Sequence, residues 1–199
     1  MKRVLIVRTG VANLASVCAA LRRLDAEPEP TRDAEAILTA DHVILPGVGA
    51  FGAAMAALDE GLAEALKARI AADRPTLAVC VGLQVLCQES EESPGVVGLG
   101  VVPGTVRRFP STVTVPQLGW NRIEPTPGSP LAAGYVYFAN SYRLDTLPPG
   151  FGGALSDHGG PFVAALARGA LLACQFHPEL SGAYGAGVLN RWLTGAAPC

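Results

Sequence analysis

Short apolar runs and one-sided helical patterns alternate through the first half of the chain. The runs lie at residues 3–7, 42–45 and 76–80, and each is bounded by polar or turn-forming residues. Continuous apolar runs of this length are typical of strands that are buried on both faces of a sheet. We therefore expect three buried strands at these positions.

Between these runs the spacing of apolar residues changes to that of a helix. Leu14, Val17, Leu21 and Leu24 recur at intervals of three, four and three residues, and Asn13 stands at the N-cap position. Strands that alternate with helices are joined by right-handed crossovers, so we expect a mostly parallel sheet that is covered on both faces. Further helices are expected over residues 33–39, 51–72, 83–88 and 185–193.

The second half of the chain is rich in Gly and Pro and in short β-branched or aromatic runs. Such runs at residues 105–109, 112–115 and 135–138 predict antiparallel strands added to one edge of the sheet. Residues 171–176 form one more buried run. The predicted fold is an open, mostly parallel α/β sheet flanked by helices, in a single domain over residues 1–199.

Composition excludes several function classes. The 199 residues carry 15 Lys+Arg and 17 Asp+Glu, a formal charge of −2, so no basic surface for nucleic acid is expected. Charged residues make up 16% of the chain, against a usual share of about 25%. An apolar surface covered by a partner and a simple bias toward Ala both account for this low share.

The same composition argues against a membrane or secreted protein. No run approaches the roughly 18 apolar residues of a membrane span, and the apolar stretch near the start is too short for a signal peptide. The five cysteines are widely spaced and form no C-x-x-C pair. We therefore expect a reduced, cytoplasmic protein with free thiols.

The buried run at residues 76–80 leads directly into a helix, with Cys80 at the junction. A nucleophile on such a strained strand–turn–helix is presented at the edge where open α/β sheets bind ligands. The helix N-terminus favours a thiolate, the backbone N–H of Val81 is directed to the same place, and Gly82 allows the tight turn. We expect Cys80 to be a nucleophile, although a cysteine after an apolar run is by itself more often a core residue.

A second candidate is His177, which ends the last buried run. The next residue is proline, which keeps His177 out of helical conformation, and Glu179 lies on the same side of an extended chain. A carboxylate that holds one ring nitrogen leaves the other free to face a thiol, so Cys80, His177 and Glu179 form a triad by role. His42 and His158 have no such neighbour and are expected to be core or surface residues.

A glycine loop, Pro46-Gly47-Val48-Gly49, joins a predicted strand to a predicted helix. Its glycines permit a backbone that turns N–H groups toward a bound oxygen. A plain turn before a helix is the alternative. Because the strand–GxGxxG–helix fingerprint is incomplete and no Walker lysine follows, we do not expect a nucleotide site.

Together these motifs resemble the class I, triad-type glutamine amidotransferases over nearly the whole chain. The family's cysteine turn, G-x-C-x-G-x-Q, is similar to residues 78–84, and its H-P-E motif is similar to residues 177–179. Within the family, the loop at residues 46–49 and the Gly-Trp-Asn segment at 119–121 resemble the glutaminase subunits of imidazole glycerol phosphate synthase.

The resemblance implies that the triad hydrolyses glutamine to glutamate and ammonia. It also implies oxyanion donors at Val81 and in the loop at Val48 and Gly49. The partner it implies is a (βα)8-barrel cyclase subunit, which forms a heterodimer with the glutaminase and uses the ammonia in histidine biosynthesis. No metal, nucleotide or organic cofactor is implied. The residues expected to hold glutamine are Gly49, Gln84, Glu92, Ser141 and Tyr142.

The chain departs from the family pattern at several positions outside the triad. Ala78 replaces the first glycine of the cysteine turn, and Gln117, Asn140 and Leu180 stand where His, His and Lys or Arg are common. The last three lie in segments expected near the cyclase, so we expect them to alter coupling more than hydrolysis. A vitamin B6 type glutaminase and a non-catalytic regulatory partner on the same scaffold are the alternatives.

Overall fold

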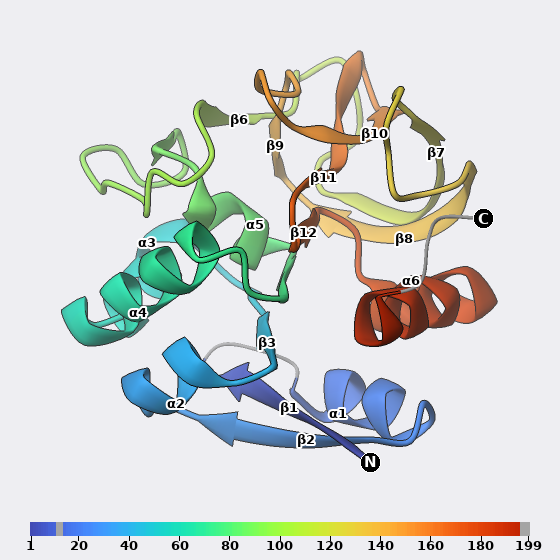
Figure 1. Cartoon of the computed structure of the whole chain (residues 1–199). Coiled ribbons are helices and arrows are strands. Elements are labelled where there is room, and N and C mark those ends of the chain that lie inside the picture. The colour runs from blue at the N-terminus through green and yellow to red at the C-terminus, as the bar shows by residue number, and fades with distance from the viewer. Residues whose placement is uncertain (11–13, 196–199) are drawn as a thin grey trace.

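The computed structural model describes residues 1–10 and 14–195, which form a nine-stranded sheet with a smaller three-stranded sheet beside it (Figure 1). The strands are β1 (Lys2–Val7), β2 (Ala26–Thr31), β3 (His42–Leu45), β4 (Thr76–Val79), β5 (Glu89–Ser90), β6 (Thr105–Arg108), β7 (Gln117–Pro125), β8 (Gly134–Asn140), β9 (Tyr142–Leu144), β10 (Gly152–Asp157), β11 (Pro161–Arg168) and β12 (Leu171–Cys174). The helices are α1 (Leu14–Arg22), α2 (Ala34–Thr39), α3 (Phe51–Ala57), α4 (Glu60–Ala71), α5 (Val81–Leu86), the 3-10 turn η1 (Pro178–Leu180) and α6 (Gly182–Thr194).

The large sheet has the order β2-β1-β3-β4-β12-β11-β10-β7-β8. The first five of these strands are parallel, and β11, β10, β7 and β8 continue the sheet in antiparallel fashion. Helices α1 and α6 lie on one side of the sheet and α2 to α5 lie on the other (Figure 1). The predicted parallel sheet with antiparallel strands at one edge is confirmed.

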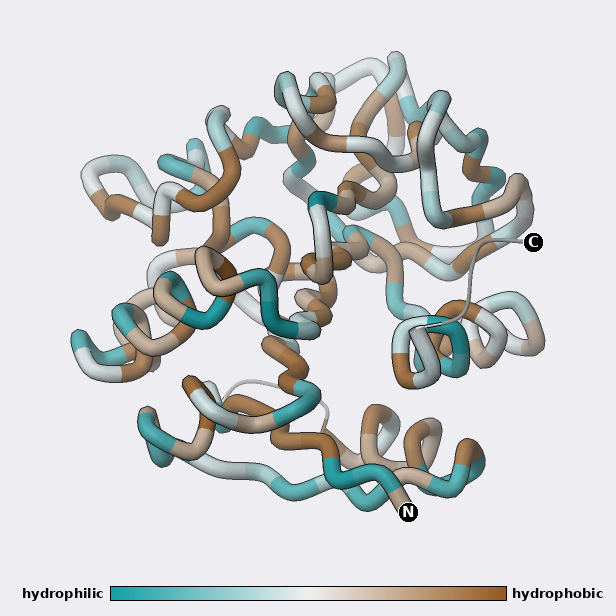
Figure 2. Tube along the Cα trace, in the orientation of Figure 1, coloured by the Kyte–Doolittle hydropathy of each residue, from teal (hydrophilic) through white to brown (hydrophobic). Residues whose placement is uncertain are grey.

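The core follows the predicted apolar runs. Four consecutive residues of β1 are buried, as are all four residues of β4 and of β12. Figure 2 shows β1 and β3 as largely hydrophobic, whereas the edge strand β2 is pale to hydrophilic. Within the described residues, no helix is both long and apolar enough to cross a membrane.

The sequence did not indicate β2, whose residues read Ala-Glu-Pro-Glu-Pro-Thr. The strand lies at the edge of the sheet and pairs only with β1, in a register that places Pro28 opposite Val4 and Pro30 opposite Ile6. Both prolines fall on alternate positions, so their missing N–H groups face the free edge, where no hydrogen bond is required.

One long helix was expected over residues 51–72, and the structure divides it into α3 and α4. Asp59 is the reason for the division, because its side chain accepts the N–H of Leu62 at 3.0 Å and caps a new helix. The N-cap expected at Asn13 lies outside the described residues.

Two strand predictions of the second half need correction. Residues 112–115 form no strand, because Val113 donates its N–H to the carbonyl of Pro110 and closes a turn. The run at 105–109 does give β6, but β6 pairs with β5 and β9 in the small sheet instead of extending the large one. The small sheet covers the carboxyl end of the parallel strands, where the candidate site lies.

Candidate active site

Cys80 lies between β4 and α5 in a strained backbone conformation, with φ of 54° and ψ of −112°. A positive φ in a residue other than glycine costs on the order of 1–3 kcal/mol and persists only where the surroundings enforce it. Here the N–H of Cys80 donates to the carbonyl of Cys174 at 2.7 Å, and its carbonyl accepts the N–H of Leu83 at 3.0 Å. The strained strand–turn–helix predicted at Cys80 is confirmed.

Gly82 allows the start of α5 to pack against the end of β3. A Cβ atom at position 82 would overlap the backbone carbonyl oxygen of Leu45, the last residue of β3. The glycine loop follows Leu45 directly, so this contact brings the loop and the cysteine turn to one edge of the sheet. Val81 is the first residue of α5, and the first N–H groups of a helix have no hydrogen-bond partner within it, so the N–H of Val81 is available to a ligand.

His177 lies beyond the end of β12, the strand next to β4, and lines the same cavity as Cys80. Its Nδ1 lies 2.8 Å from Oε1 of Glu179, and the interaction of its ring with the thiol of Cys80 favours the protonated imidazole. Because Nδ1 is engaged by the carboxylate, Nε2 is the nitrogen left for the sulfur. The backbone of His177 is held as well, since its N–H donates to the carbonyl of Tyr137 at 2.9 Å and its carbonyl accepts Oγ of Ser181 at 2.6 Å.

The charge state of His177 follows from this setting. Burial lowers the pKa of His177, but hydrogen bonds to Cys80 and Glu179, together with the charge on both groups, outweigh burial and raise the pKa to about 10. The imidazole therefore keeps its proton at neutral pH when a thiolate lies beside it. An imidazolium held between a thiolate and a carboxylate is the arrangement used for nucleophilic cysteine catalysis.

Cys80 and His177 both line a cavity of about 220 Å³. This volume is below the roughly 300–1,000 Å³ that suits drug-sized ligands and fits a small polar metabolite. Every position expected for the oxyanion donors and for glutamine binding lies on its wall. The cavity is lined by Val48, Gly49, Cys80, Val81, Gln84, Glu92, Ala139, Asn140, Ser141, Tyr142 and His177.

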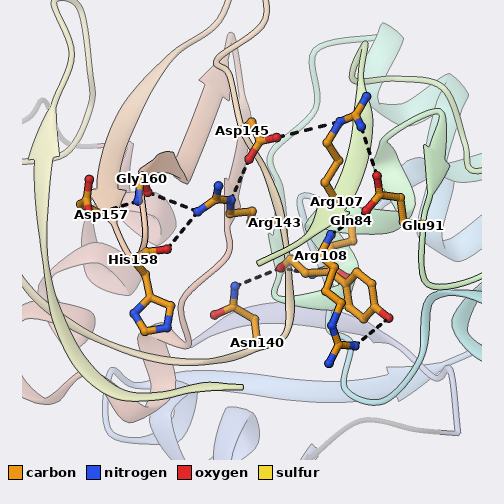
Figure 3. Close-up of polar contacts among 11 residues, drawn as sticks. Gln84, Glu91, Arg107, Arg108, Asn140, Arg143, Asp145, Asp157, His158 and Gly160 are labelled. Atoms are coloured by element: carbon orange, nitrogen blue, oxygen red, sulfur yellow. Dashed lines mark hydrogen bonds and ion pairs between the residues drawn. The ribbon is translucent and has the colours of Figure 1, made fainter. Parts of the chain in front are cut away.

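Two amide side chains hold one wall of the cavity. Gln84 and Asn140 both donate to the backbone carbonyl of Tyr142, at 3.1 and 3.0 Å. Figure 3 shows Gln84 and Asn140 beside this segment and, next to it, Asp145 between two arginines. Arg143 binds Asp145 at 2.7 Å. These contacts hold the segment that carries Tyr142 in place.

Glu92 reaches the cavity from the loop after β5. Its Oε2 accepts the N–H of Phe51 at 2.6 Å, and the neighbouring Ser93 accepts the N–H of Gly52 at 3.0 Å. These two side chains cap α3, whose N-cap residue, Ala50, makes no side-chain cap of its own. Glu92 therefore ties the helix after the glycine loop to the cavity wall.

Two further residues of the site were not predicted from the sequence. Gln175 is completely buried, and its Nε2 lies 3.6 Å from Sγ of Cys80. Ser181 fixes the backbone of His177, as described above, and also accepts the N–H of Tyr137 at 3.0 Å. Gln175 had a usable signal, because it precedes His177 by two residues and so lies on the same side of an extended chain.

The other cysteines of the described residues lie away from the cavity. Cys18, Cys87 and Cys174 are buried and free. Burial raises the pKa of Cys87 to about 12 and also raises the pKa of Cys174, so both stay as neutral thiols. Within residues 1–10 and 14–195, no group of three or more His, Cys, Asp or Glu side chains has the arrangement to hold a metal ion.

Comparison with known proteins identifies the family. The family model described as glutamine amidotransferase class-I matches residues 6–194. The chain belongs to this family. Two similar relatives are imidazole glycerol phosphate synthase subunits HisH. The one from Symbiobacterium thermophilum is 41% identical over 96% of this chain and 93% of its own length. The one from Methanothermobacter thermautotrophicus is 42% identical over 94% of this chain and 96% of its own length.

Solved structures share the fold of this family member at lower identity. A crystal structure of a glutamine amidotransferase superposes with a TM-score of 0.76 at 21% identity, covering 96% of this chain and 99% of that one. The structure of PurLQS from Thermotoga maritima gives a TM-score of 0.75 at 17% identity, with 98% of both chains covered. At this identity the likeness shows the fold alone.

Proposed function

We propose that this chain is the glutaminase subunit of imidazole glycerol phosphate synthase and hydrolyses L-glutamine to glutamate and ammonia in the cytoplasm. The observation that carries the chemistry is the contact of Cys80 with His177, and of His177 with Glu179, at the wall of one small polar cavity. The similarity of about 40% to imidazole glycerol phosphate synthase subunits, over nearly the whole length, supports the place of that chemistry in histidine biosynthesis.

In the proposed reaction the thiolate of Cys80 attacks the side-chain amide carbon of glutamine. The carbon–nitrogen bond then breaks, and His177 gives its proton to the leaving nitrogen, which departs as ammonia and leaves a glutamyl thioester. His177 next takes a proton from water, whose oxygen attacks the thioester, and glutamate leaves as the sulfur is released. Glu179 holds the ring at Nδ1, so the same nitrogen faces the sulfur in both steps.

Negative charge develops on the amide oxygen of glutamine during this attack, and hydrogen-bond donors are needed to stabilise it. The N–H of Val81 at the start of α5 is one, and the loop at Val48 and Gly49 supplies the other, since both residues line the cavity. Gly49 has a φ of 86°, and because glycine adopts both signs of φ without strain, the peptide between these two residues can turn its N–H toward the cavity. One such donor is worth about 10²–10³ in rate.

The remaining wall residues suit the charged α-carbon end of glutamine and its neutral amide end. Glu92 uses one carboxylate oxygen on the N–H of Phe51, which leaves the other for the α-ammonium group. Ser141, Tyr142 and Gln84 line the cavity as well, and these polar groups suit the α-carboxylate and the side-chain amide. Gly49 closes the cavity on the side of the loop.

An exposed apolar surface beside the cavity supports a partner that receives ammonia. Leu118, Trp120 and Tyr135 are 69%, 57% and 61% exposed, and they project from the same outer face of β7 and β8. Leu180, which follows the triad glutamate, is exposed as well. Large exposed apolar groups that lie together mark protein interfaces. We propose that a (βα)8-barrel cyclase subunit covers this surface, which we call the β7–β8 face, in a heterodimer.

The proposal is tested with the cyclase subunit encoded in the same genome. Glutamate release is measured for the chain alone, with the cyclase, and with the cyclase and its ribonucleotide substrate. We expect slow hydrolysis alone and a strong rise with the liganded cyclase. The Cys80→Ala chain should release no glutamate, while its complex should still use added ammonium salts. No glutamate release in any mixture would overturn the proposal, and activation by a vitamin B6 synthase subunit instead would reassign the pathway.

A further inference from the structure

A second side chain besides His177 contacts the reactive sulfur. Gln175 is 0% exposed, and its Nε2 lies 3.6 Å from Sγ of Cys80. The other end of the same amide accepts a hydrogen bond, because Nε2 of Gln84 donates to Oε1 of Gln175 at 3.0 Å. Since an amide oxygen cannot donate, this bond requires the NH₂ end of Gln175 to face the sulfur.

The backbone explains why the two side chains converge on Cys80. β4 and β12 are neighbouring parallel strands, and Cys80 donates its N–H to the carbonyl of Cys174. Gln175 follows that carbonyl directly, and His177 lies two residues further along an extended chain. Residues two apart in extended chain point to the same side. One short segment therefore brings both an imidazole and an amide to the sulfur.

A buried amide at this position is unusual on physical grounds. An apolar side chain of similar volume would fill the space without the desolvation that a buried amide requires. The two hydrogen bonds of Gln175 offset that desolvation, and one of them ends on the proposed nucleophile. A donor directed at a group that ionises to an anion favours the anion over its neutral form.

We propose that Gln175 is a positioning residue for glutamine hydrolysis, which donates its amide N–H to the sulfur of Cys80 and stabilises the thiolate. The inference rests on the proposed function for its purpose, although the contact itself is independent of it. Gln84 extends the arrangement to the substrate cavity, because it lines the cavity and also orients Gln175. The amide pair thus links the wall that meets glutamine to the atom that attacks it.

The test measures the thiolate directly, without glutamine or a partner. The full-length chain is alkylated with iodoacetamide at a series of pH values, and modification of the peptide containing Cys80 is followed by mass spectrometry. The Gln175→Met variant removes the donor at nearly constant volume. We expect the midpoint of its rate profile to move up by about one pH unit, so that alkylation below the midpoint is about tenfold slower. The limiting rate at high pH should stay close to that of the unaltered chain.

Two further variants separate the hydrogen bond from packing. Phe176→Leu changes a buried neighbour without touching the hydrogen bonds of Gln175, and its pH midpoint should not move. Gln175→Asn keeps an amide that ends one methylene short of the sulfur, so its midpoint should rise as in Gln175→Met. If either Gln175→Met or Gln175→Asn fails to fold, the other still tests the hydrogen bond. Circular dichroism and thermal unfolding show whether each variant is folded.

The outcomes separate this inference from the proposed function. A profile for the Gln175 variants that superposes on that of the unaltered chain, or an equal shift in Phe176→Leu, would overturn the role of Gln175. Glutamine hydrolysis by the unaltered chain would be unaffected by that result. Conversely, a shifted profile in a chain that never hydrolyses glutamine would support the amide contact and overturn the glutaminase proposal.

Discussion

At the scale of single residues, the site depends on three groups that alter one another's charge. A buried imidazole ordinarily loses its proton, because the interior disfavours the charged form. His177 keeps its proton because a thiol that can ionise and a carboxylate lie on its two sides, and together they raise its pKa to about 10. The charge on the ring depends on these neighbours and not on the ring alone.

Removing either neighbour should lower the pKa of His177. In Cys80→Ala and in Glu179→Gln, burial continues to disfavour the imidazolium while one of the groups that favours it is gone. We expect the pKa to fall by about one to three units in each variant. NMR titration of the His177 ring carbon signals in the unaltered chain and in both variants measures the change.

An unchanged titration of His177 in both variants would contradict the placement of the imidazole between Cys80 and Glu179. If the pKa of His177 falls in Glu179→Gln but not in Cys80→Ala, the sulfur of Cys80 does not interact with the imidazole. The two variants therefore report on the two sides of the imidazole separately.

At the scale of elements, the site lies where three strands end and helix α5 begins. Cys80 lies between β4 and α5, His177 lies between β12 and η1, and the glycine loop follows β3. Adjacent parallel strands bring their carboxyl ends to one edge, which is where ligands bind in such sheets. The distance between the loop and the cysteine turn depends on how closely α5 approaches β3.

Gly82→Ala tests that approach. The added methyl group would overlap the carbonyl oxygen of Leu45, and both partners are backbone, so α5 or the end of β3 must move. We expect the free energy of unfolding to fall by about 2 kcal/mol, and glutaminase activity to fall with it because the oxyanion donors separate. Denaturant unfolding and glutamate release measure the two effects.

Gly61→Ala is the matched control. Its methyl group would meet Asp59 at an ordinary contact distance of 3.5 Å, on the exposed side of α4. Gly61 lies in the first turn of α4, where Ala is a better helix former than Gly, so this variant should be at least as stable as the unaltered chain. Equal stability of the two variants would show that Gly82 is not closely packed.

At the scale of the whole molecule, the cavity and the β7–β8 face are joined. The register pairs Gln117 with Asn140 on the buried side of the hairpin and Trp120 with Tyr137 on the outer side. Asn140 also lines the cavity, so one hairpin connects the cavity wall to the proposed docking surface. Both amide atoms of Gln117 and the Oδ1 of Asn140 are buried without a hydrogen-bond partner among the described residues. These are two of the three positions expected to alter coupling.

Trp120→Ala tests the docking surface. A central tryptophan of an interface commonly contributes 2 kcal/mol or more, so we expect cyclase binding to weaken by about thirtyfold or more. Hydrolysis by the chain alone should persist, because Trp120 does not line the cavity. Calorimetric titration with the cyclase and glutamate release at saturating cyclase measure the two properties.

Val97→Ala is the control for exposure alone. Val97 is 71% exposed and lies outside the β7–β8 face, near β5 and β6. Its substitution should leave cyclase binding unchanged. Weakening of binding by Val97→Ala, with no effect of Trp120→Ala, would place the partner on a different surface.

Local sequence patterns were enough to predict much of the fold and of the candidate site. Continuous apolar runs identified β1, β3, β4 and β12, and apolar residues at intervals of three and four identified α1, because each element forms from one continuous segment. The strained turn at Cys80 and the His177–Glu179 contact also follow from neighbours in sequence. A strand that runs into a helix, and two side chains two residues apart, leave few other geometries.

Features that depend on segments far apart in sequence were decided by the tertiary structure. β2 forms despite two prolines because β1 offers a pairing edge, and β6 belongs to the small sheet because β5 and β9 lie on its two sides. Gln175 meets the sulfur of Cys80 only because β12 lies beside β4, ninety-five residues earlier in the chain. A pairing of this kind depends on sheet order, and sheet order is set by the packing of the whole core and not by any local pattern.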